Sequence, residues 1–172
     1  VNPPSPAGFT PLSALTEGDH NVALGRIAGD ALTTGSSNII IGSGAGSDTT
    51  DVDSAVIIGT DAGAANLTSG ADGAILIGHG AGQALTTGGR NTAIGFEALM
   101  TATELTHNIA IGRQALKDSS ATTSHRNIAI GSHSLDGIGS NVAADNVCIG
   151  YDTGTATTTA DNNILIGSYA GD

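Results

Sequence analysis

The chain has 172 residues, of which 26 are glycine and only 2% are aromatic, and its formal net charge is −11 at pH 7. Five Lys and Arg residues in so acidic a chain argue against phosphate binding, so we expect no nucleic-acid partner and no attachment to anionic lipid. Glycine interrupts every apolar stretch within a few residues, which excludes a membrane-spanning helix and predicts no membrane insertion.

Residues 1–18 do not share the pattern that fills the rest of the chain. They begin VNPPSPAGFTP and contain all four prolines. Proline-rich segments are typical of extended spacers. We therefore expect residues 1–18 to be an arm or linker, and residues 19–172 to be a repeat domain.

From residue 19 onward, a pentapeptide occurs nine times. It reads NIAIG at residues 108–112 and again at 127–131, and every copy ends in glycine. Successive glycines lie 17 or 19 residues apart, and we place the extra residues of a longer step in the polar stretch before the next copy, such as residues 69–73. Length variation confined to one loop is typical of stacked coils that contact only their neighbours. The repeat residues are Asn21, Gly25, Asn38, Gly42, Gly59, Gly78, Asn91, Gly95, Asn108, Gly112, Asn127, Gly131, Asn146, Gly150, Asn163 and Gly167.

Each pentapeptide predicts a short strand. The residues three and one before the glycine are nearly all β-branched, and their spacing of two puts them on the same face of a strand. Stacked in parallel register, they predict an aliphatic ladder inside each coil. The expected fold is therefore an all-β parallel β-solenoid of about nine coils, which at ~4.8 Å per strand makes a rod on the order of 43 Å long.

The residue between these two points to the opposite face, which we assign to the outside of the coil. It is apolar in every copy, whereas a sheet with one solvated face carries polar residues there. An exposed apolar stripe of this length needs a cover, and another copy of the chain is the simplest one. We therefore predict a homo-oligomeric rod whose interface is formed by this column. The column comprises Ala23, Ile40, Ile57, Leu76, Ala93, Ala110, Ala129, Cys148 and Leu165.

The invariant features of the repeat predict structural roles. We expect the glycine at each strand end to supply a positive φ or to allow close packing of coils. The asparagine at strand entry is expected either to form an amide ladder from coil to coil or to cap the preceding turn. Cys148 shares a column with Ala, Ile and Leu, so we expect it to be a small packing residue and not a nucleophile.

The stretches NTAIGFEAL, NIAIGRQAL and NIAIGSHSL carry a resemblance to known repeats. They resemble the head repeats of trimeric autotransporter adhesins, and they are similar to repeats in bacteriophage tail fibres and in fibre proteins released by an endosialidase-type intramolecular chaperone. The adhesin coils are shorter, so the spacing here is closer to that of the fibre proteins. The resemblance covers roughly residues 19–172 and implies a left-handed β-roll and a homotrimer. It also implies an extracellular, cell-surface or virion location, and a role as a shaft or an adhesive head.

Two positions after each strand vary while the repeat around them holds. Variable side chains on a rigid scaffold are what a recognition surface uses. Aromatic rings there would stack on sugars and arginines would bind acidic groups, which predicts a glycan or a surface receptor as a partner. Ordinary surface variety on a stalk is the alternative. The ligand-binding candidates are Arg26, His79, Phe96, Arg113, Tyr151 and Tyr169.

Other chemistry has weaker support. No G-x-S-x-G elbow is present, so we assign no catalytic residue and expect no enzymatic activity. His20 and His107 directly precede the strand asparagine, which indicates a solvated loop edge rather than a zinc site. Asp48, Asp51 and Asp53 are a weak candidate calcium site, because their loop lacks the glycine and glutamate of an EF-hand. We expect no other cofactor.

Threonine pairs occur at one place in the coil, at 33–34, 86–87 and 158–159. They leave ice binding open as an alternative. Taken together, these patterns predict a non-enzymatic structural segment of an extracellular or virion fibre or adhesin. The alternatives are a head that binds glycans directly, and a monomeric solenoid that binds ice or calcium.

Overall fold

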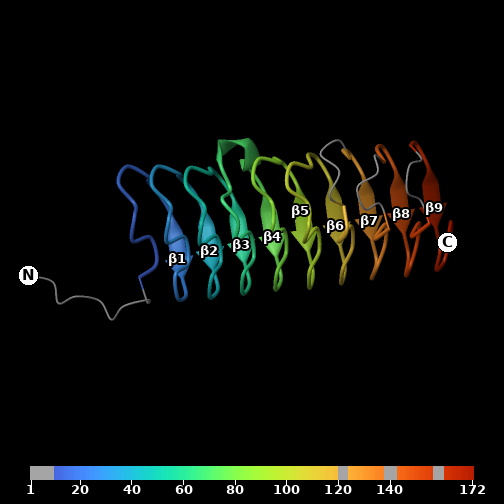
Figure 1. Cartoon of the computed structure of the whole chain (residues 1–172), viewed down its shortest axis with the longest axis horizontal. Coiled ribbons are helices and arrows are strands. Elements are labelled where there is room, and N and C mark those ends of the chain that lie inside the picture. Colours follow the sequence, from blue (N-terminus) through green and yellow to red (C-terminus); the bar gives the residue numbers. More distant parts are fainter. Residues whose placement is uncertain (1–9, 120–123, 138–142, 157–160) are drawn as a thin grey trace, which may run out of the picture.

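A computed structural model describes residues 10–119, 124–137, 143–156 and 161–172 of the chain. Across these residues, nine strands form a single parallel sheet, in which each strand pairs with its neighbours in sequence order (Figure 1). The predicted parallel β-solenoid is thereby confirmed. The strands are β1 (Val22–Leu24), β2 (Ile39–Ile41), β3 (Val56–Ile58), β4 (Ile75–Ile77), β5 (Thr92–Ile94), β6 (Ile109–Ile111), β7 (Ile128–Ile130), β8 (Val147–Ile149) and β9 (Ile164–Ile166).

The strand register is constant along the stack. Val56 pairs with Ile75 across a long step, in the same way that Val22 pairs with Ile39 across a short one. The extra residues of the β3–β4 step form the 3-10 helix η1 (Ser69–Ala71), which projects from one edge of the stack in Figure 1. The polar stretch therefore absorbs the longer step, as predicted, and the ladder is not disturbed.

Residues 10–18 do not form an arm. Leu12 and Leu15 pack against the hydrophobic core, and the Leu12 amide donates a hydrogen bond to the Ala28 carbonyl. The Thr16 amide likewise donates to the Thr33 carbonyl of the next coil. This segment is a partial coil that stacks on the return half of the first complete coil, because its leucines gain burial that an extended arm would not provide. Residues 1–9 of the predicted arm lie outside the described residues.

The two faces of the sheet are the reverse of the prediction. The central residue of each strand points into the coil: Ile40, Leu76 and Cys148 have no exposed surface in the single chain. The predicted interface column is therefore core, with Ala23 and Leu165 of the end coils partly buried against it. The second half of each coil closes over this side of the sheet, so the central side chains are covered by their own chain.

The β-branched residues expected inside the coil point outward instead. Val22, Leu24 and Ile39 are 54%, 66% and 39% exposed, and the equivalent residues of the middle coils are half-buried by their neighbours above and below. A three-residue strand sends one side chain inward and two outward, because alternate side chains point to opposite faces. The aliphatic ladder exists, but it lies on the outer face of the solenoid.

Within the core of seven of the nine coils, the central strand residue and the residue four positions after the strand glycine complement each other in size. Leu76 faces Gly82, where an added Cβ would lie 2.6 Å from the Leu76 Cδ2. In the next coil the sizes are exchanged, and Ala93 is accompanied by the buried Leu99. Such pairing keeps the packed volume of each layer similar, as close-packed interiors require. The large–Gly pairs are Ile40/Gly46, Ile57/Gly63, Leu76/Gly82 and Leu165/Gly171, and the Ala–Leu pairs are Ala93/Leu99, Ala110/Leu116 and Ala129/Leu135.

The strand-end glycine serves both of the roles considered for it. Gly95 has a φ of +139°, and an added Cβ would lie 2.3 Å from the Gly112 carbonyl oxygen of the next coil. An L side chain rarely adopts this backbone angle. No side chain fits at that separation either, so the coils stack closely only because this column is glycine.

The asparagines form the predicted amide ladder. The Asn108 Oδ1 accepts hydrogen bonds from the Asn127 backbone N at 2.9 Å and from the Asn127 Nδ2 at 3.2 Å. The same arrangement joins Asn127 to Asn146. Where alanine replaces asparagine, the Ala55 amide still donates to the Asn38 Oδ1, but the ladder ends there. The ladder satisfies backbone groups that would otherwise be buried without partners.

Candidate functional site

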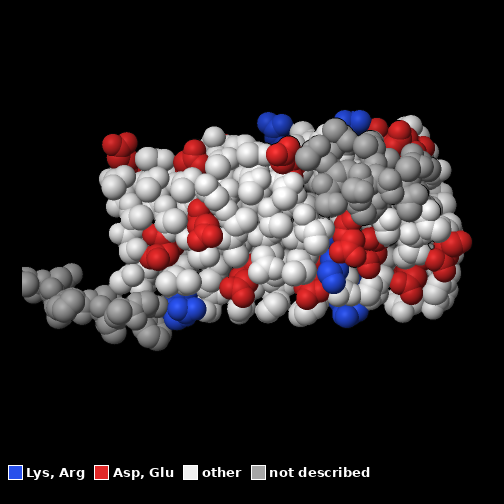
Figure 2. Space-filling view, in the orientation of Figure 1, with Lys and Arg blue, Asp and Glu red and all other residues white. Residues whose placement is uncertain are grey.

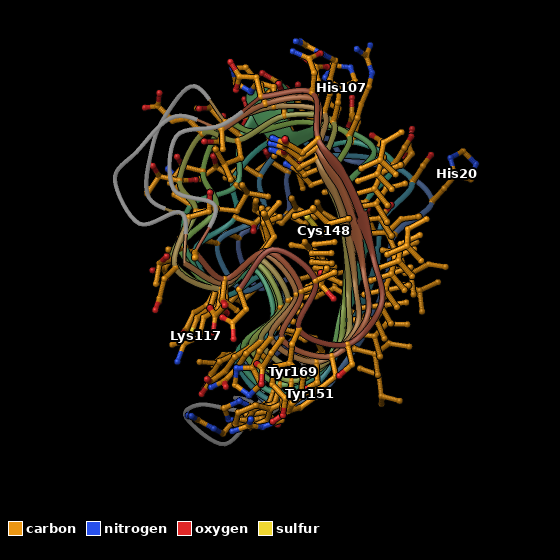
Figure 3. The ribbon with its side chains drawn as sticks, turned by 90° about the vertical axis from the view of Figure 1, so that its right-hand side faces the viewer. His20, His107, Lys117, Cys148, Tyr151 and Tyr169 are labelled. Carbon is orange, nitrogen blue, oxygen red and sulfur yellow. The ribbon has the colours of Figure 1, made fainter. Side chains whose placement is uncertain are left out.

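The outward sheet face is a continuous apolar surface that runs along all nine strands. It consists of the first and third residues of each strand, and Thr92 is its one polar residue. In Figure 3, which looks along the stack, these side chains project from the sheet, while Cys148 lies inside the coil. Apolar patches of this extent on a soluble protein mark interaction surfaces.

A second surface lies on one edge of the stack, at the turn that follows each strand. We call it the aromatic edge. Its side chains come from the first or second position after the strand glycine, in six coils that follow one another. The aromatic edge comprises His79, Phe96, Arg113, His133, Tyr151 and Tyr169. In Figure 3, Tyr151 and Tyr169 lie at this edge, opposite His107.

In the first half of the aromatic edge, the rings of His79 and Phe96 stack with centroids 5.2 Å apart and an interplanar angle of 14°. The Arg113 guanidinium carbon lies 6.0 Å from the Phe96 ring centroid, at the limit of a cation–π contact. Arg113 also donates from Nη1 to the His133 Nε2 at 2.5 Å. Three neighbouring coils thus present one continuous layer of flat groups.

The second half continues the series. His133 meets Tyr151 edge-on at 6.5 Å, and Tyr151 meets Tyr169 edge-on at 5.5 Å. Phe96, Tyr151 and Tyr169 are 44%, 47% and 58% exposed, and they are all of the Phe and Tyr residues that the structure describes. The aromatic side chains of this region therefore contribute to a surface and not to the core.

Charges beside the aromatic edge are arranged in a local network. The Glu97 carboxylate accepts from the Gln114 Nε2 at 2.7 Å and lies 3.2 Å from the Lys117 Nζ. The hydrogen bond from Gln114, together with Lys117, lowers the pKa of Glu97. On the Tyr151 side, hydrogen bonding to Asp152 and its charge raise the pKa of the phenol. The phenol is therefore an uncharged hydrogen-bonding group at neutral pH.

The structure brings five of the six ligand-binding candidates together and leaves one apart. Arg26 lies in the coil of β1, separated from His79 by two coils whose equivalent residues are Ser43 and Thr60. His133, which the sequence analysis left out, fills the gap between Arg113 and Tyr151. The sequence signal that could have identified His133 was its place at the second variable position after the strand glycine.

The candidate calcium site is not formed. The Asp53 Oδ1 accepts from the Ser36 backbone N of the preceding coil, whereas the Asp51 Oδ1 accepts from the Ser69 backbone N of the following coil. Their carboxylates thus serve opposite neighbours, and Asp48 is exposed. No group of three His, Cys, Asp or Glu residues suited to a metal ion occurs among the described residues, so the acidic-loop candidate is wrong.

The threonine pairs are used within the stack. The Thr33 Oγ1 donates to the Thr50 carbonyl and the Thr86 Oγ1 to the Thr103 carbonyl, each in the next coil. One hydroxyl of each described pair therefore donates its proton within the protein. Only the other hydroxyl of each pair keeps its proton for the ice-binding alternative. The pair at 158–159 lies outside the described residues.

The opposite edge carries the residues that directly precede each strand asparagine. His20 and His107 are exposed there, as expected for a solvated loop edge. Arg126 forms a two-point ion pair with Asp145, at 2.6 and 2.7 Å. The hydrogen bonds from Arg126 lower the pKa of Asp145. Figure 2 shows few cations and scattered acidic groups on the face it displays.

Next to η1 this edge contains a hollow of about 250 Å³, which sequence reasoning did not predict. The insertion that forms η1 was the signal for it, because a projecting loop beside unchanged coils leaves a recess. We call it the η1 hollow. The side chains that line it are Ser69, Asp72, Arg90, Thr106 and His107.

Comparisons with known proteins add no family to this picture. None of the helical residues within the described ranges forms a segment long and apolar enough to cross a bilayer. No family model, no curated protein and no solved structure matches the chain.

Proposed function

We propose that this chain is a non-enzymatic structural segment of an extracellular or virion fibre, in which sister chains pack side by side through the outward sheet face. The supporting observation is that face itself, with two aliphatic columns running along nine strands and interrupted by the single hydroxyl of Thr92. Covering it removes apolar surface from water at roughly 25 cal/mol per Å². The parallel stack repeats at every coil, so an identical chain offers a matching face.

The resemblance of the repeat to fibre and adhesin head repeats supports three as the number of chains. A closed cyclic arrangement of this kind buries the apolar face of every copy and leaves both turn edges near solvent. The stack then serves as a rigid spacer whose edges present variable side chains. The extracellular or virion location rests on the same resemblance.

Sedimentation equilibrium tests the assembly. We expect a mass three times that of the 16.7 kDa chain. The double variant Ile94→Asp with Ile111→Asp places charges in the middle of the outward sheet face and should sediment as a monomer. Thr34→Asp with Thr87→Asp, exposed on another side, is the matched control and should remain trimeric. Circular dichroism establishes that both variants keep the strand signal.

A folded monomer in the unmodified chain would overturn the assembly proposal. A dimer would retain the interface but correct the number of chains. Loss of trimers in both double variants would mean that added charge, rather than its place on the sheet, disrupts association.

A second function is favoured by the aromatic edge. We propose that this edge binds glycans, since exposed flat rings in series offer stacking faces for sugar rings and Arg113 offers a cation for acidic groups. Keeping three aromatic side chains exposed in a chain with so few of them is difficult to explain by packing alone.

Glycan-array binding tests this second function. Phe96→Ala and Tyr151→Ala should each reduce binding by about tenfold, a loss typical of one stacking contact. Ser43→Ala and Thr60→Ala occupy equivalent turn positions in other coils and should leave binding unchanged. An array without any bound glycan would reject the glycan function and leave the structural role in place.

A further inference from the structure

The η1 hollow is an interruption in an otherwise regular edge. η1 rises beside the residues that precede β5 and β6, and the recess between them is open to solvent. Its floor is backbone. An added Cβ at Gly70 would lie 2.7 Å from the Thr87 carbonyl oxygen, and one at Gly89 would lie 2.6 Å from the Gly70 carbonyl oxygen. Side chains therefore cannot fill the floor, and the recess is maintained by the close approach of the coils.

The wall formed by the residues that precede β5 and β6 carries a cation without a carboxylate partner in the described part of the chain. Arg90 is exposed and has no carboxylate partner within ion-pair distance among the described residues, in contrast to Arg126. The Arg90 Nη1 donates to the His107 Nε2 at 3.2 Å. Since a guanidinium can only donate, this imidazole nitrogen is the acceptor in the contact. A guanidinium that has no carboxylate partner, in a recess of an acidic chain, is suited to a carboxylate ligand.

The remaining walls offer groups for hydroxyls. The Thr106 backbone N and Oγ1 both lie within hydrogen-bond distance of the His125 Nδ1, at 3.3 and 3.0 Å. The backbone N–H can only donate, so this nitrogen is an acceptor and the Thr106 hydroxyl also donates to it. The lone pairs of the Thr106 oxygen are then free to accept. Asp72 uses its Oδ1 to accept from the Asp53 backbone N at 2.8 Å and keeps a second carboxylate oxygen.

We propose that the η1 hollow binds a carboxylate-bearing monosaccharide, such as a uronic acid residue of a glycan. Arg90 holds the sugar carboxylate, while Asp72 and Thr106 accept hydrogen bonds from its hydroxyls. The mixture of one cation with several acceptors distinguishes this ligand from a simple anion, because Asp72 repels an anion that brings no donor of its own. The hollow accommodates a single sugar residue, and its binding is independent of how sister chains pack.

Titration calorimetry of the chain with glucuronate, together with backbone-amide chemical shifts, tests the proposal. We expect binding with a Kd on the order of 1 mM, as for a small polar ligand in an open site. Glucose, which lacks the carboxylate, should bind at least about tenfold more weakly. The shifts should occur in residues 69–73, 89–90 and 106–107.

Arg90→Gln should weaken glucuronate binding by about tenfold or more, since it removes a charge-assisted pair. Gln114 occupies a similar positive-φ turn, so the replacement is compatible with the backbone. Arg26→Gln is the matched control on the other edge and should not change binding. Absence of glucuronate binding, equal binding of glucose, or equal loss in Arg90→Gln and Arg26→Gln would overturn the proposal. Loss of glucuronate binding in a third variant, Arg113→Gln, without loss in Arg90→Gln would place the sugar on the aromatic edge and also reject the η1 hollow.

The glucuronate-binding test and the test of trimer assembly can fail independently of each other. Sedimentation of Arg90→Gln reports the oligomeric state without ligand and should match that of the unmodified chain. A monomer that still binds glucuronate would reject the trimer and keep the hollow, and a trimer without binding would do the reverse.

Discussion

Size complementarity in the core predicts that two damaging substitutions compensate each other. Leu76 is fully buried, so Leu76→Ala leaves a cavity and should cost about 3 kcal/mol of unfolding free energy. Gly82→Leu alone places a side chain whose Cβ lies 2.6 Å from the Leu76 Cδ2, and this overpacking should cost about 2 kcal/mol.

The double variant Leu76→Ala with Gly82→Leu recreates the arrangement of the next coil, where Ala93 is accompanied by Leu99. A leucine fits the backbone there, because Leu99 has a φ of 55° and Gly82 one of 58°. We expect the double variant to lose only about 2 kcal/mol instead of the summed loss of about 5 kcal/mol, a coupling of about 3 kcal/mol.

Equilibrium unfolding in urea, followed by circular dichroism, measures all three variants. Leu76→Ala combined with Leu135→Gly is the matched control, because these residues lie in separate coils and their losses should add within about 0.5 kcal/mol. If the losses from Leu76→Ala and Gly82→Leu also added, the two positions would not share one layer of the core, and the reasoning would be wrong.

Further predictions concern the strand-end glycine Gly95, the thiol of Cys148 and the carboxylate of Asp145. Gly95→Ala should lower the unfolding free energy by about 4 kcal/mol, from backbone strain and from displacement of the next coil. Gly73→Ala has open space around its Cβ and a φ of 72°, so it should cost only about 1 kcal/mol, and equal losses in the two urea curves would contradict this reasoning. Burial raises the pKa of Cys148 to about 11, so roughly 0.1% of a thiol with that pKa is ionised at pH 8, and a thiol reagent should modify it only at the rate of unfolding. Rapid modification of the native chain would show that the thiol is accessible. The pKa of Asp145 is lowered by Arg126, so the ion pair stabilises fully above the ordinary carboxyl pKa of about 4, and its contribution disappears as the pH falls through the lower folded value. Arg126→Gln should raise the Asp145 pKa in a carbon-13 NMR titration, and an unchanged value would exclude the ion pair in solution.

Much of the fold follows from local rules that the sequence displays. A glycine at every strand end allows coils to approach to backbone contact, and the constant pentapeptide sets the register of each strand against the next. The position of η1 follows from the longer step, since an insertion is accommodated where no ladder is interrupted. The asparagine was expected to form an amide ladder or to cap the preceding turn, and it does both: its Oδ1 forms the ladder, while the Asn91 Nδ2 donates to the Gly88 carbonyl of the preceding turn.

The aromatic edge could be predicted only in part. Spacing placed Phe96 and Tyr151 in the same column, but their connection through Arg113 and His133 depends on side-chain directions that spacing does not specify. Arg26 satisfied the same pattern and lies apart because two small residues separate its coil from the others. The η1 hollow arises from the height of a loop above its neighbours, which is a property of the folded chain.

The orientation of the sheet is the point at which local patterns were insufficient. Alternation separates Ile40 from Ile39 and Ile41 but does not say which side faces the core when all three residues are aliphatic. The return half of the coil settles it, because its small residues and leucines cover the central side chains and leave the other two columns outside. The exchange between Leu76/Gly82 and Ala93/Leu99 reflects that enclosure, since only residues sharing a closed space must compensate each other in volume.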